Sequence, residues 1–437
     1  MKQLKRTLLF LSILMTSALI ISCSDNDDDE GPTQGVVEGQ VMSNEDSTPL
    51  EGVQVSVFDS DSNEPIGRTV KTDAEGNYSL DLNPGTYYLR LATLGYQEVP
   101  PLGVPAIPFT IVVGETVQLD YELVKSANQD VGAISGKIQG NGSALSGVLV
   151  IATSEDGTNA YSSISDQDGN YTIWNLPAGT YGVKGWLKAY NSENVSTSVT
   201  VVAIIEETDI NMSAGANGSI NGTVKYLATG NKDVDVSLIH PITQQVIPGL
   251  SISTSGAFTL EGIPDGSYLA RASFNNDTLV VDPDFIVKFG DPVVAVEGGT
   301  TSVSQGTSIK DVLDFAVTNS VQLDNPTNSA DEIVPVETNT TGLTFSWTPY
   351  SSASDYVVEL QDLNGNVVWG GFDTSGEIPL KNITTTSTSI TYDGPALTAG
   401  KIYRWKVYAS KDDQKSAAGW NLISVSEDQM GLIRITE

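Results

Sequence analysis

The chain has 437 residues, with 22 basic and 54 acidic side chains and a formal net charge of −32. This balance argues against nucleic-acid binding, because phosphate contacts depend on Lys and Arg to release counterions. The length predicts several domains. Hydrophobic residues make up 39% of the chain, which indicates a folded protein and not a disordered acidic one. A single cysteine leaves no internal disulfide and no zinc–thiolate site.

Residues 1–22 have the features of a secretory signal peptide. Basic residues occupy three of the first six positions, and an apolar run follows over residues 8–21. This run is shorter than the about 20 residues that span a membrane. The sequence Ile20-Ile21-Ser22-Cys23 resembles the lipobox of bacterial lipoproteins, with Ile20 in place of the more usual leucine. The resemblance implies cleavage before Cys23 and acylation of its thiol. The alternative is a chance cysteine at the end of an uncleaved signal anchor.

An acidic run follows directly, over residues 24–30. It resembles the export signal of Bacteroidota-type surface lipoproteins, which implies display on the outer leaflet. The alternative is a solvated acidic linker on the periplasmic face of the outer membrane. Residues 23–34 are therefore expected to be a lipidated cysteine and an acidic tether, and the localisation to be the outer membrane with exposure on the cell surface.

The remaining residues predict an all-β fold, a tandem array of small antiparallel β-sandwiches. Short alternating runs rich in Val, Ile, Thr and Tyr are separated by Gly, Pro, Asn and Asp. Residues 308–315 are expected to form at most one or two helical turns. Three repeats stand out. Each opens with paired glycines: Gly35 and Gly39, Gly132 and Gly136, Gly218 and Gly222. Each continues with a turn and an aromatic residue: Asp73 to Tyr78, Asp166 to Tyr171, Ser255 to Phe258. Each then has a proline or glycine turn and a tyrosine: Tyr87, Tyr181, Tyr268.

This order of motifs resembles the carboxypeptidase regulatory-like domain. The resemblance implies small transthyretin-like β-sandwiches at residues 35–125, 131–214 and 217–319. The third copy has lost the acidic residues of the turn, and its tail is longer. The family name implies no peptidase activity, because this domain carries no zinc ligands of its own.

Residues 321–437 differ from the repeats. A Trp347 strand, a Tyr356 strand and a strand with Tyr403 and Trp405 resemble a fibronectin type III-like domain. Trp347 and Trp405 alternate with apolar neighbours and are expected in its core. The junctions between domains are short, so the array is expected to be a semi-rigid rod.

Catalytic and metal-binding residues are sparse, and we expect no enzyme, no metal and no cofactor. His240 is the only histidine and is interpreted as an ordinary residue at a strand end. A nucleophilic triad needs a histidine beside a nucleophile, and a histidine-based zinc site usually needs at least two histidines. Paired carboxylates would suffice for a glycosidase, so a carboxylate-dependent hydrolase stays an alternative. Asp166-Gln167-Asp168-Gly169-Asn170 faintly resembles a calcium loop, but turn chemistry explains it.

Aromatic side chains are the better candidates for binding, because exposed rings stack on sugars or anchor partners. Period 2 along the strand places Trp186 on the face opposite to Tyr181, and Trp174 is expected to point outward as well. Trp369 and Trp420 lie in turn-rich parts of the last domain. The alternative for each is partial burial against a neighbouring domain.

Three functional hypotheses follow. The first is a non-catalytic surface lipoprotein, held in the outer membrane through Cys23, whose β-sandwich stalk displays a binding face for a glycan or a protein. The second is an accessory subunit of an outer-membrane uptake or secretion complex. The third is the hydrolase named above.

Overall fold

The structure, a computed structural model, confirms the all-β fold built from separate antiparallel β-sandwiches. It describes residues 33–101, 104–227, 233–274, 279–281, 291–305, 308–310, 312–329, 333–373, 384–412 and 419–436. Within these ranges every regular element is a strand, so none is a helix long and apolar enough to cross a membrane. The expected signal peptide, Cys23 and the acidic tether lie outside the described residues.

Domain 1 (residues 35–125) consists of two facing sheets. One sheet has the order β4-β1-β7, with β8 also paired to β1, and the other has the order β3-β2-β5-β6. The strands are β1 (Gly35–Ser43), β2 (Gln54–Asp59), β3 (Pro65–Lys71), β4 (Asn77–Leu82), β5 (Gly85–Ala92), β6 (Phe109–Ile111), β7 (Thr116–Gln118) and β8 (Tyr121–Leu123). Alternating side chains of both sheets, among them Val37, Leu80 and Leu89, form the core.

Domain 2 (residues 131–214) repeats this pairing scheme. The first sheet has the order β10-β9-β18-β15, with β13 and β17 also on β9, and the second has the order β12-β11-β14-β16. The strands are β9 (Val131–Gly140), β10 (Ser143–Ala144), β11 (Leu149–Ser154), β12 (Ala160–Ile164), β13 (Asn170–Pro177), β14 (Gly179–Trp186), β15 (Tyr190–Ser192), β16 (Asn194–Val199), β17 (Ile204–Ile205) and β18 (Ile210–Ala214).

Domain 3 (residues 217–319) has the same arrangement of first strands, with a longer second sheet. The sheets have the orders β22-β19-β28-β24 and β21-β20-β23-β25-β26-β27. The strands are β19 (Gly218–Tyr226), β20 (Val234–Ile239), β21 (Val246–Thr254), β22 (Ala257–Ile263), β23 (Gly266–Phe274), β24 (Leu279–Val281), β25 (Val293–Glu297), β26 (Thr300–Gln305), β27 (Ser308–Lys310) and β28 (Val312–Asn319). Helical turns at 308–315 were the wrong expectation, because β28 pairs with β19 in the first sheet.

The repeated glycine and tyrosine have one structural reason. In domain 1 a Cβ at Gly39 would lie 1.8 Å from the carbonyl oxygen of Leu119. The Tyr78 hydroxyl donates to that same oxygen at 2.7 Å. Gly136 and the Tyr171 hydroxyl of domain 2 meet the Thr208 oxygen in the same way. The glycine therefore admits a crossing segment, and the tyrosine hydrogen bond holds that segment in place.

Domain 4 (residues 321–437) is built differently. It has a small sheet of order β29-β31-β35 and a large sheet of order β30-β38-β36-β32-β33, with β34 on β32 and β37 on β36. The strands are β29 (Leu323–Asn325), β30 (Val336–Asn339), β31 (Thr344–Trp347), β32 (Asp355–Asp362), β33 (Val367–Gly370), β34 (Thr384–Thr385), β35 (Ser389–Thr391), β36 (Ile402–Asp412), β37 (Trp420–Val425) and β38 (Leu432–Thr436). Trp347 and Trp405 are fully buried between the sheets, as predicted.

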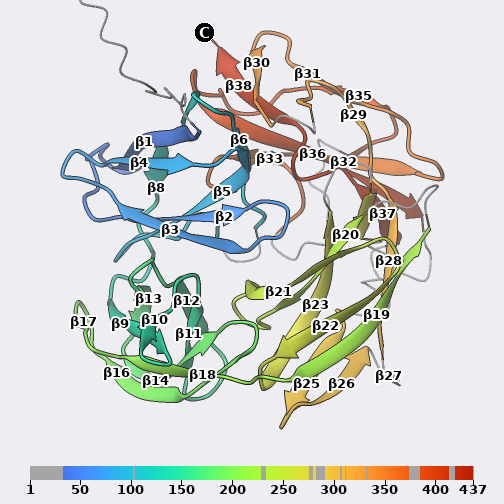
Figure 1. Cartoon of the computed structure of the whole chain (residues 1–437). Helices are drawn as coiled ribbons and strands as arrows, with labels where there is room; N and C mark the ends of the chain where they lie inside the picture. Colours follow the sequence, from blue (N-terminus) through green and yellow to red (C-terminus); the bar gives the residue numbers. More distant parts are fainter. Residues whose placement is uncertain are drawn as a thin grey trace, which may run out of the picture.

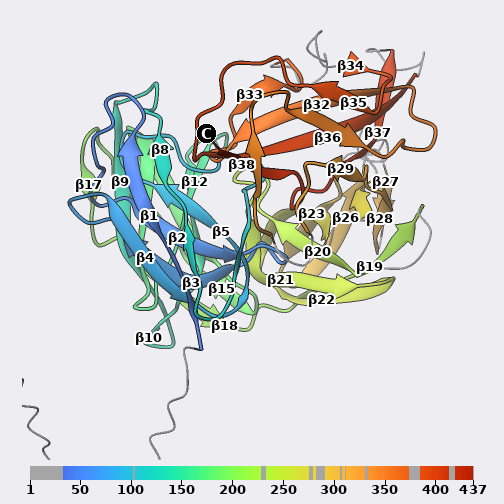
Figure 2. The ribbon, with the colours of Figure 1, turned by 90° about the horizontal axis from the view of Figure 1, so that it is seen from above.

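The domains do not extend into a rod. Figure 1 shows domains 1 and 2 on one side and domains 3 and 4 on the other, arranged around a common centre, and the view from above in Figure 2 keeps the same two pairs. Domain 4 returns to contact domain 1, where Arg404 donates to the carbonyl oxygens of Pro105 and Ala106 at 2.8 and 2.9 Å. The expectation of a rod is therefore wrong, because short junctions permit a closed ring once the domain faces are complementary.

Candidate binding site at the centre of the four domains

Several central strands are buried on both faces, which is the physical basis of the ring. All six residues of β20 are buried, as are the first five of β2 and the six inner residues of β32. One face of each strand packs into the core of its own domain. The other face packs against a neighbouring domain, so the outward faces of these sheets are interfaces and not solvent-exposed surfaces.

Domains 1, 2 and 3 share an apolar cluster. Phe58 of domain 1 and Leu149, Ile151 and Trp186 of domain 2 belong to the same cluster as the core of domain 3. Backbone bonds reinforce the contact between domains 2 and 3, where the Ala189 amide donates to the Gly262 carbonyl oxygen at 2.7 Å. Apolar burial of this kind supplies the main free energy of association between domains.

Glu64 connects domain 1 to domain 3. The backbone of Gly249 and Ser251 in domain 3 favours the charged form of its carboxylate. Burial nevertheless raises the pKa of Glu64, because removal from water disfavours the charged form.

A buried polar network closes the ring between domains 4 and 1. Arg404 is 0% exposed, and besides its two domain 1 acceptors it donates to the Gln361 Oε1 at 2.7 Å. Gln361 in turn donates to the Glu359 carboxylate at 2.7 Å, and Lys406 forms an ion pair with Asp428. Burial raises the pKa of Glu359, although Lys406 and Arg404 oppose this shift. Apolar contacts extend this interface, where Ile107 of domain 1 packs in a small cluster with Ile333 and Leu432 of domain 4.

A cavity of about 720 Å³ lies where the four domains meet. This volume is within the range of small-molecule sites. Domain 1 contributes Phe58, Asn63, Tyr88, Arg90, Tyr96, Gln97, Glu98, Pro100, Pro101, Val104, Pro105, Ala106 and, at its end, Ser126 and Asn128. Domain 2 contributes Val131, Ala160, Tyr161, Ser162, Asn175 and Pro177, domain 3 contributes Ser237, Ile239, Thr243, Gln244, Gln245, Val246, Arg271 and Ala272, and domain 4 contributes Asp428.

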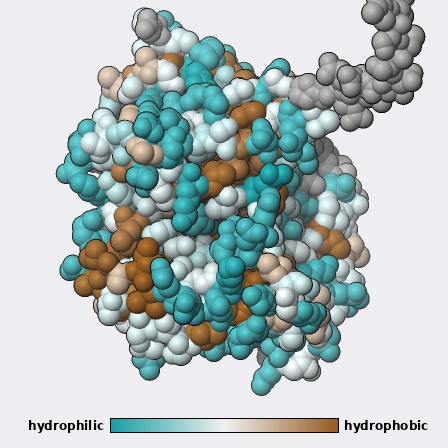
Figure 3. All heavy atoms as spheres, turned by 60° about the vertical axis from the view of Figure 1, so that its left-hand side comes forward, coloured by the Kyte–Doolittle hydropathy of each residue, from teal (hydrophilic) through white to brown (hydrophobic). Residues whose placement is uncertain are grey.

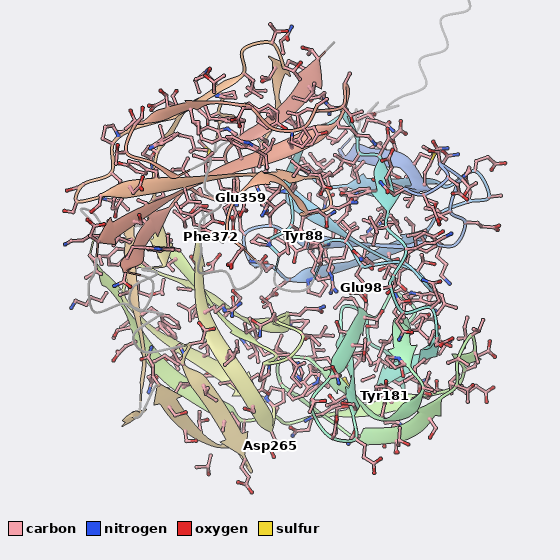
Figure 4. All side chains as sticks on the ribbon, turned by 180° about the vertical axis from the view of Figure 1, so that it is seen from behind. Tyr88, Glu98, Tyr181, Asp265, Glu359 and Phe372 are labelled. Carbon is pink, nitrogen blue, oxygen red and sulfur yellow. The ribbon has the colours of Figure 1, made fainter. Side chains whose placement is uncertain are left out.

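The inner wall of domain 1 is aromatic and charged. Figure 4 shows Tyr88 and Glu98 on the side of domain 1 that faces the centre, and Glu359 and Phe372 on the inner side of domain 4. Tyr88 stacks on Phe58 with the ring centroids 5.1 Å apart. Arg90 lies over the Phe58 ring and pairs with Glu98 at 3.1 Å. Burial raises the pKa of Glu98, and the Arg90 charge partly offsets this.

The structure brings none of the four proposed binding tryptophans into an exposed binding face. Trp174 is 8% exposed and donates from Nε1 to the Gln54 Oε1 of domain 1 at 3.3 Å. Trp186 is 7% exposed and packs edge-on against His240 and Tyr268 of domain 3. The expectation that both point to solvent is wrong, because a neighbouring domain covers the face that alternation turns away from the core.

The two tryptophans of domain 4 also have structural contacts. Trp369 is 8% exposed and donates to the Asp393 carboxylate at 3.0 Å. Trp420 is half-buried and stacks on Phe372 at 5.8 Å. Of the four, Trp420 alone keeps appreciable exposure.

His240 lies at the end of β20, as expected for a strand-end residue, but it is buried. Its Nδ1 accepts from the Thr243 amide at 3.2 Å, and its ring contacts Trp186. Burial, with a further contribution from the Lys184 charge, lowers the pKa of His240 to about 4. The side chain is therefore neutral near pH 7.

The aspartates in the turns of the first two repeats accept hydrogen bonds from backbone amides of the same turn. The Asp166 carboxylate accepts from the amides of Asp168 and Asn170 at 2.9 and 2.8 Å. Asp73 does the same for Glu75 and Asn77 in domain 1. Among the described residues no group of three or more His, Cys, Asp or Glu side chains is placed to hold a metal ion.

The outer surface carries an apolar loop on domain 2. Val201, Val202 and Ile204 are 46%, 73% and 47% exposed. Figure 3 shows apolar atoms gathered on the side of the molecule that bears domains 1 and 2. Exposed apolar patches of this kind mark interaction surfaces more often than isolated apolar residues do.

Comparison with known proteins identifies the type of the first domain. Residues 36–124 match the model of the Carboxypeptidase regulatory-like domain. This is a non-catalytic type of domain, and the match covers domain 1 alone. The chain as a whole is a tandem β-sandwich protein, in which domains 2 and 3 share the strand pairing of domain 1.

A curated relative is Colossin-A of Dictyostelium discoideum, which is 26% identical over 268 residues. The alignment covers 53% of this chain and 2% of Colossin-A, so the chain spans a very small part of that protein. Among solved structures, the Bacillus anthracis TIE protein is 15% identical, with a TM-score of 0.17 and coverage of 66% of this chain and 51% of that one. The shaft pilin SpaA of Lactobacillus rhamnosus GG is 12% identical, with a TM-score of 0.18 and coverage of 42% and 98%. Likenesses at these scores carry no argument about function.

The tryptophans alone do not point to the residues of the central cavity. Tyr88 directly follows the core residue Tyr87, and period 2 turns it to the opposite face of β5. The run Val148 to Ala152 is continuously apolar, which is typical of a strand buried on both faces. Together these two signals indicate an aromatic wall beneath a neighbouring domain.

Proposed function

We propose that the protein is a non-catalytic surface lipoprotein of the outer membrane, held through acylated Cys23, whose closed ring of four β-sandwiches binds a glycan or a protein. The observation that carries the proposal is the central cavity, because all four domains contribute to its wall. A ring that only served as a spacer would have no need for partly exposed tyrosines and amides at that position. Domain 4 is proposed to be fibronectin type III-like, on the strength of its Trp347 and Trp405 core.

The anchoring part is tested on the full chain in a Bacteroidota host. Metabolic labelling with an alkyne fatty acid should mark the wild-type protein and leave Cys23→Ser unmarked. A variant with Asp27, Asp28 and Asp29 changed to Asn should still be labelled but should lose accessibility to external protease. Labelling of Cys23→Ser would contradict lipidation at this residue, and unchanged protease access in the Asn variant would contradict the acidic export signal.

The binding part is tested with the full chain purified in detergent. Saturable binding to surface polysaccharide or to a membrane protein is the expected result. Labelled, surface-exposed protein that binds neither would indicate a spacer and contradict the binding function.

An accessory role in an outer-membrane uptake or secretion complex is a second candidate. The apolar loop with Val201, Val202 and Ile204 favours it, because such a loop suits contact with another protein. Co-purification of a membrane complex with the wild type, lost in a Val202→Asp variant, is the expected result. Retention of the complex by that variant would exclude this loop as the contact.

A further inference from the structure

The central cavity has a composition that defines a class of ligand. Its wall combines partly exposed tyrosine rings with side-chain amides. The rings are Tyr88, Tyr96 and Tyr161, and the amides are Asn63, Gln97, Asn128, Gln244 and Gln245. A further amide, that of Asn175, is already hydrogen-bonded to the backbone of domain 1. Aromatic faces pack on the apolar faces of sugar rings, and amides both donate to and accept from hydroxyl groups.

The charged groups of the wall balance one another. Arg90 pairs with Glu98 at 3.1 Å, and Arg271 pairs with Asp291 at 2.8 Å. Asp428 pairs with Lys406. Among the described residues, the wall therefore presents no unpaired charge for a ligand ion, and the net charge of −32 on the chain repels anions from the whole molecule. These two facts favour a neutral ligand.

The cavity is open to solvent, and a buried polar atom in its wall has no hydrogen-bond partner among the described residues. Gln97, Asn128 and Pro105 are exposed residues of the wall, so solvent reaches it. Gln245 donates from Nε2 to the Ser162 hydroxyl at 2.6 Å, but its Oε1 has no hydrogen-bond partner within the described part of the chain. A buried acceptor without a donor is costly. Rotation of this amide toward the cavity would let a ligand hydroxyl donate to it.

We propose that the cavity between the four domains is a binding site for a neutral oligosaccharide. This inference rests on the proposed binding function and narrows it to one site and one ligand class. The tyrosine rings of domains 1 and 2 stack on the sugars, and the amides of domains 1 and 3 form hydrogen bonds with the sugar hydroxyl groups. Since domains 1, 2 and 3 supply nearly all of the wall, the site exists only when these three domains are packed together.

The test is isothermal titration calorimetry of the full chain in detergent with cellohexaose, xylohexaose and mannohexaose as neutral probes. Oligogalacturonate serves as the anionic probe and a decaproline peptide as the peptide probe. At least one neutral probe should bind, and oligogalacturonate should not. Tyr161→Ala should weaken binding between about three- and tenfold, the range expected for loss of one aromatic contact.

A bulky substitution gives the sharper comparison. Gln97→Trp adds a bulky ring to the exposed part of the cavity wall and should abolish binding, while Gln167→Trp, at an exposed turn outside the cavity, should leave binding unchanged. Equal thermal unfolding of the two variants shows that both rings are intact.

Three results would overturn the inference. Binding that survives Gln97→Trp places the site elsewhere and leaves the general binding function standing. Binding of decaproline without any sugar assigns the cavity to peptides. Failure of all these probes, in a protein that still binds a surface extract, refutes the saccharide class but not the proposed function.

Discussion

Arg404 is expected to be the residue on which closure of the ring depends. It is fully buried and donates to the carbonyl oxygens of Pro105 and Ala106 in domain 1, and to the Asp428 carbonyl and the Gln361 amide oxygen in domain 4. Replacement by Met keeps most of the stem but leaves these acceptors without their charged donor. Removal of one partner from a buried charged network costs about 3–5 kcal/mol, and the two orphaned carbonyls of domain 1 alone, at about 1–3 kcal/mol each, give a similar figure.

Arg434 provides a matched control. It lies on the adjacent strand β38 and forms a partly exposed ion pair with Glu337 at 3.5 Å. Exposed pairs contribute about 0–1 kcal/mol, so Arg434→Met should have little effect.

Two measurements check the reasoning. Urea unfolding should show a loss of about 3–5 kcal/mol for Arg404→Met and at most about 1 kcal/mol for Arg434→Met. Hydrogen exchange should become faster around residues 104–110 in the first variant only. Equal stability and equal exchange in the two variants would refute the role of Arg404 in closure.

Three further predictions concern the interfaces. Trp186→Ala should cost about 3–5 kcal/mol in thermal unfolding because it empties the contact between domains 2 and 3, whereas half-buried Trp420→Ala should cost clearly less; equal losses would contradict the burial argument. Burial lowers the pKa of His240 to about 4, so the folded state favours the neutral imidazole. This preference stabilises the fold fully above the unfolded pKa of about 6.5, and the stabilisation is lost as the pH falls through about 4. The advantage of wild type over His240→Asn in free energy of unfolding should therefore shrink by about 3 kcal/mol between pH 7 and pH 4, and a constant difference would speak against it. Gly365 and Gly400 both have positive φ, 88° and 79°, but a Cβ at Gly365 would lie 2.5 Å from a domain 1 side chain and one at Gly400 meets nothing within 4 Å. Gly365→Ala should thus lower the melting temperature more than Gly400→Ala, and equal shifts would show that backbone strain alone is at work.

The repeated motifs are explained by interactions within each repeat. Paired glycines, an aromatic residue after a tight turn and a second tyrosine recur in all three repeats, and each has a local structural reason. The Tyr87 hydroxyl donates back to the Asn83 carbonyl oxygen, and the Tyr268 hydroxyl to that of Pro264. Interactions within a single repeat therefore suffice to predict the sandwiches and their cores.

The candidate site was predictable only in part. Trp174 and Trp186 were correctly placed on the faces that alternation turns away from their own core. Alternation cannot tell solvent from a neighbouring domain, so it could not distinguish a binding face from an interface. The continuous apolar run at Val148 to Ala152 was the available indication that this face is covered.

The sequence by itself determined the all-β class, the repeated sandwich template, the buried Trp347 and Trp405, and the prediction of a lipid anchor at Cys23. The tertiary structure decided the closed ring, the burial of three of the four candidate tryptophans and the cavity shared by four domains. The physical reason is separation along the chain. Arg404 and Pro105 are 299 residues apart and meet only once every domain has folded. Contacts of this range depend on complementary surfaces, and no local periodicity encodes them.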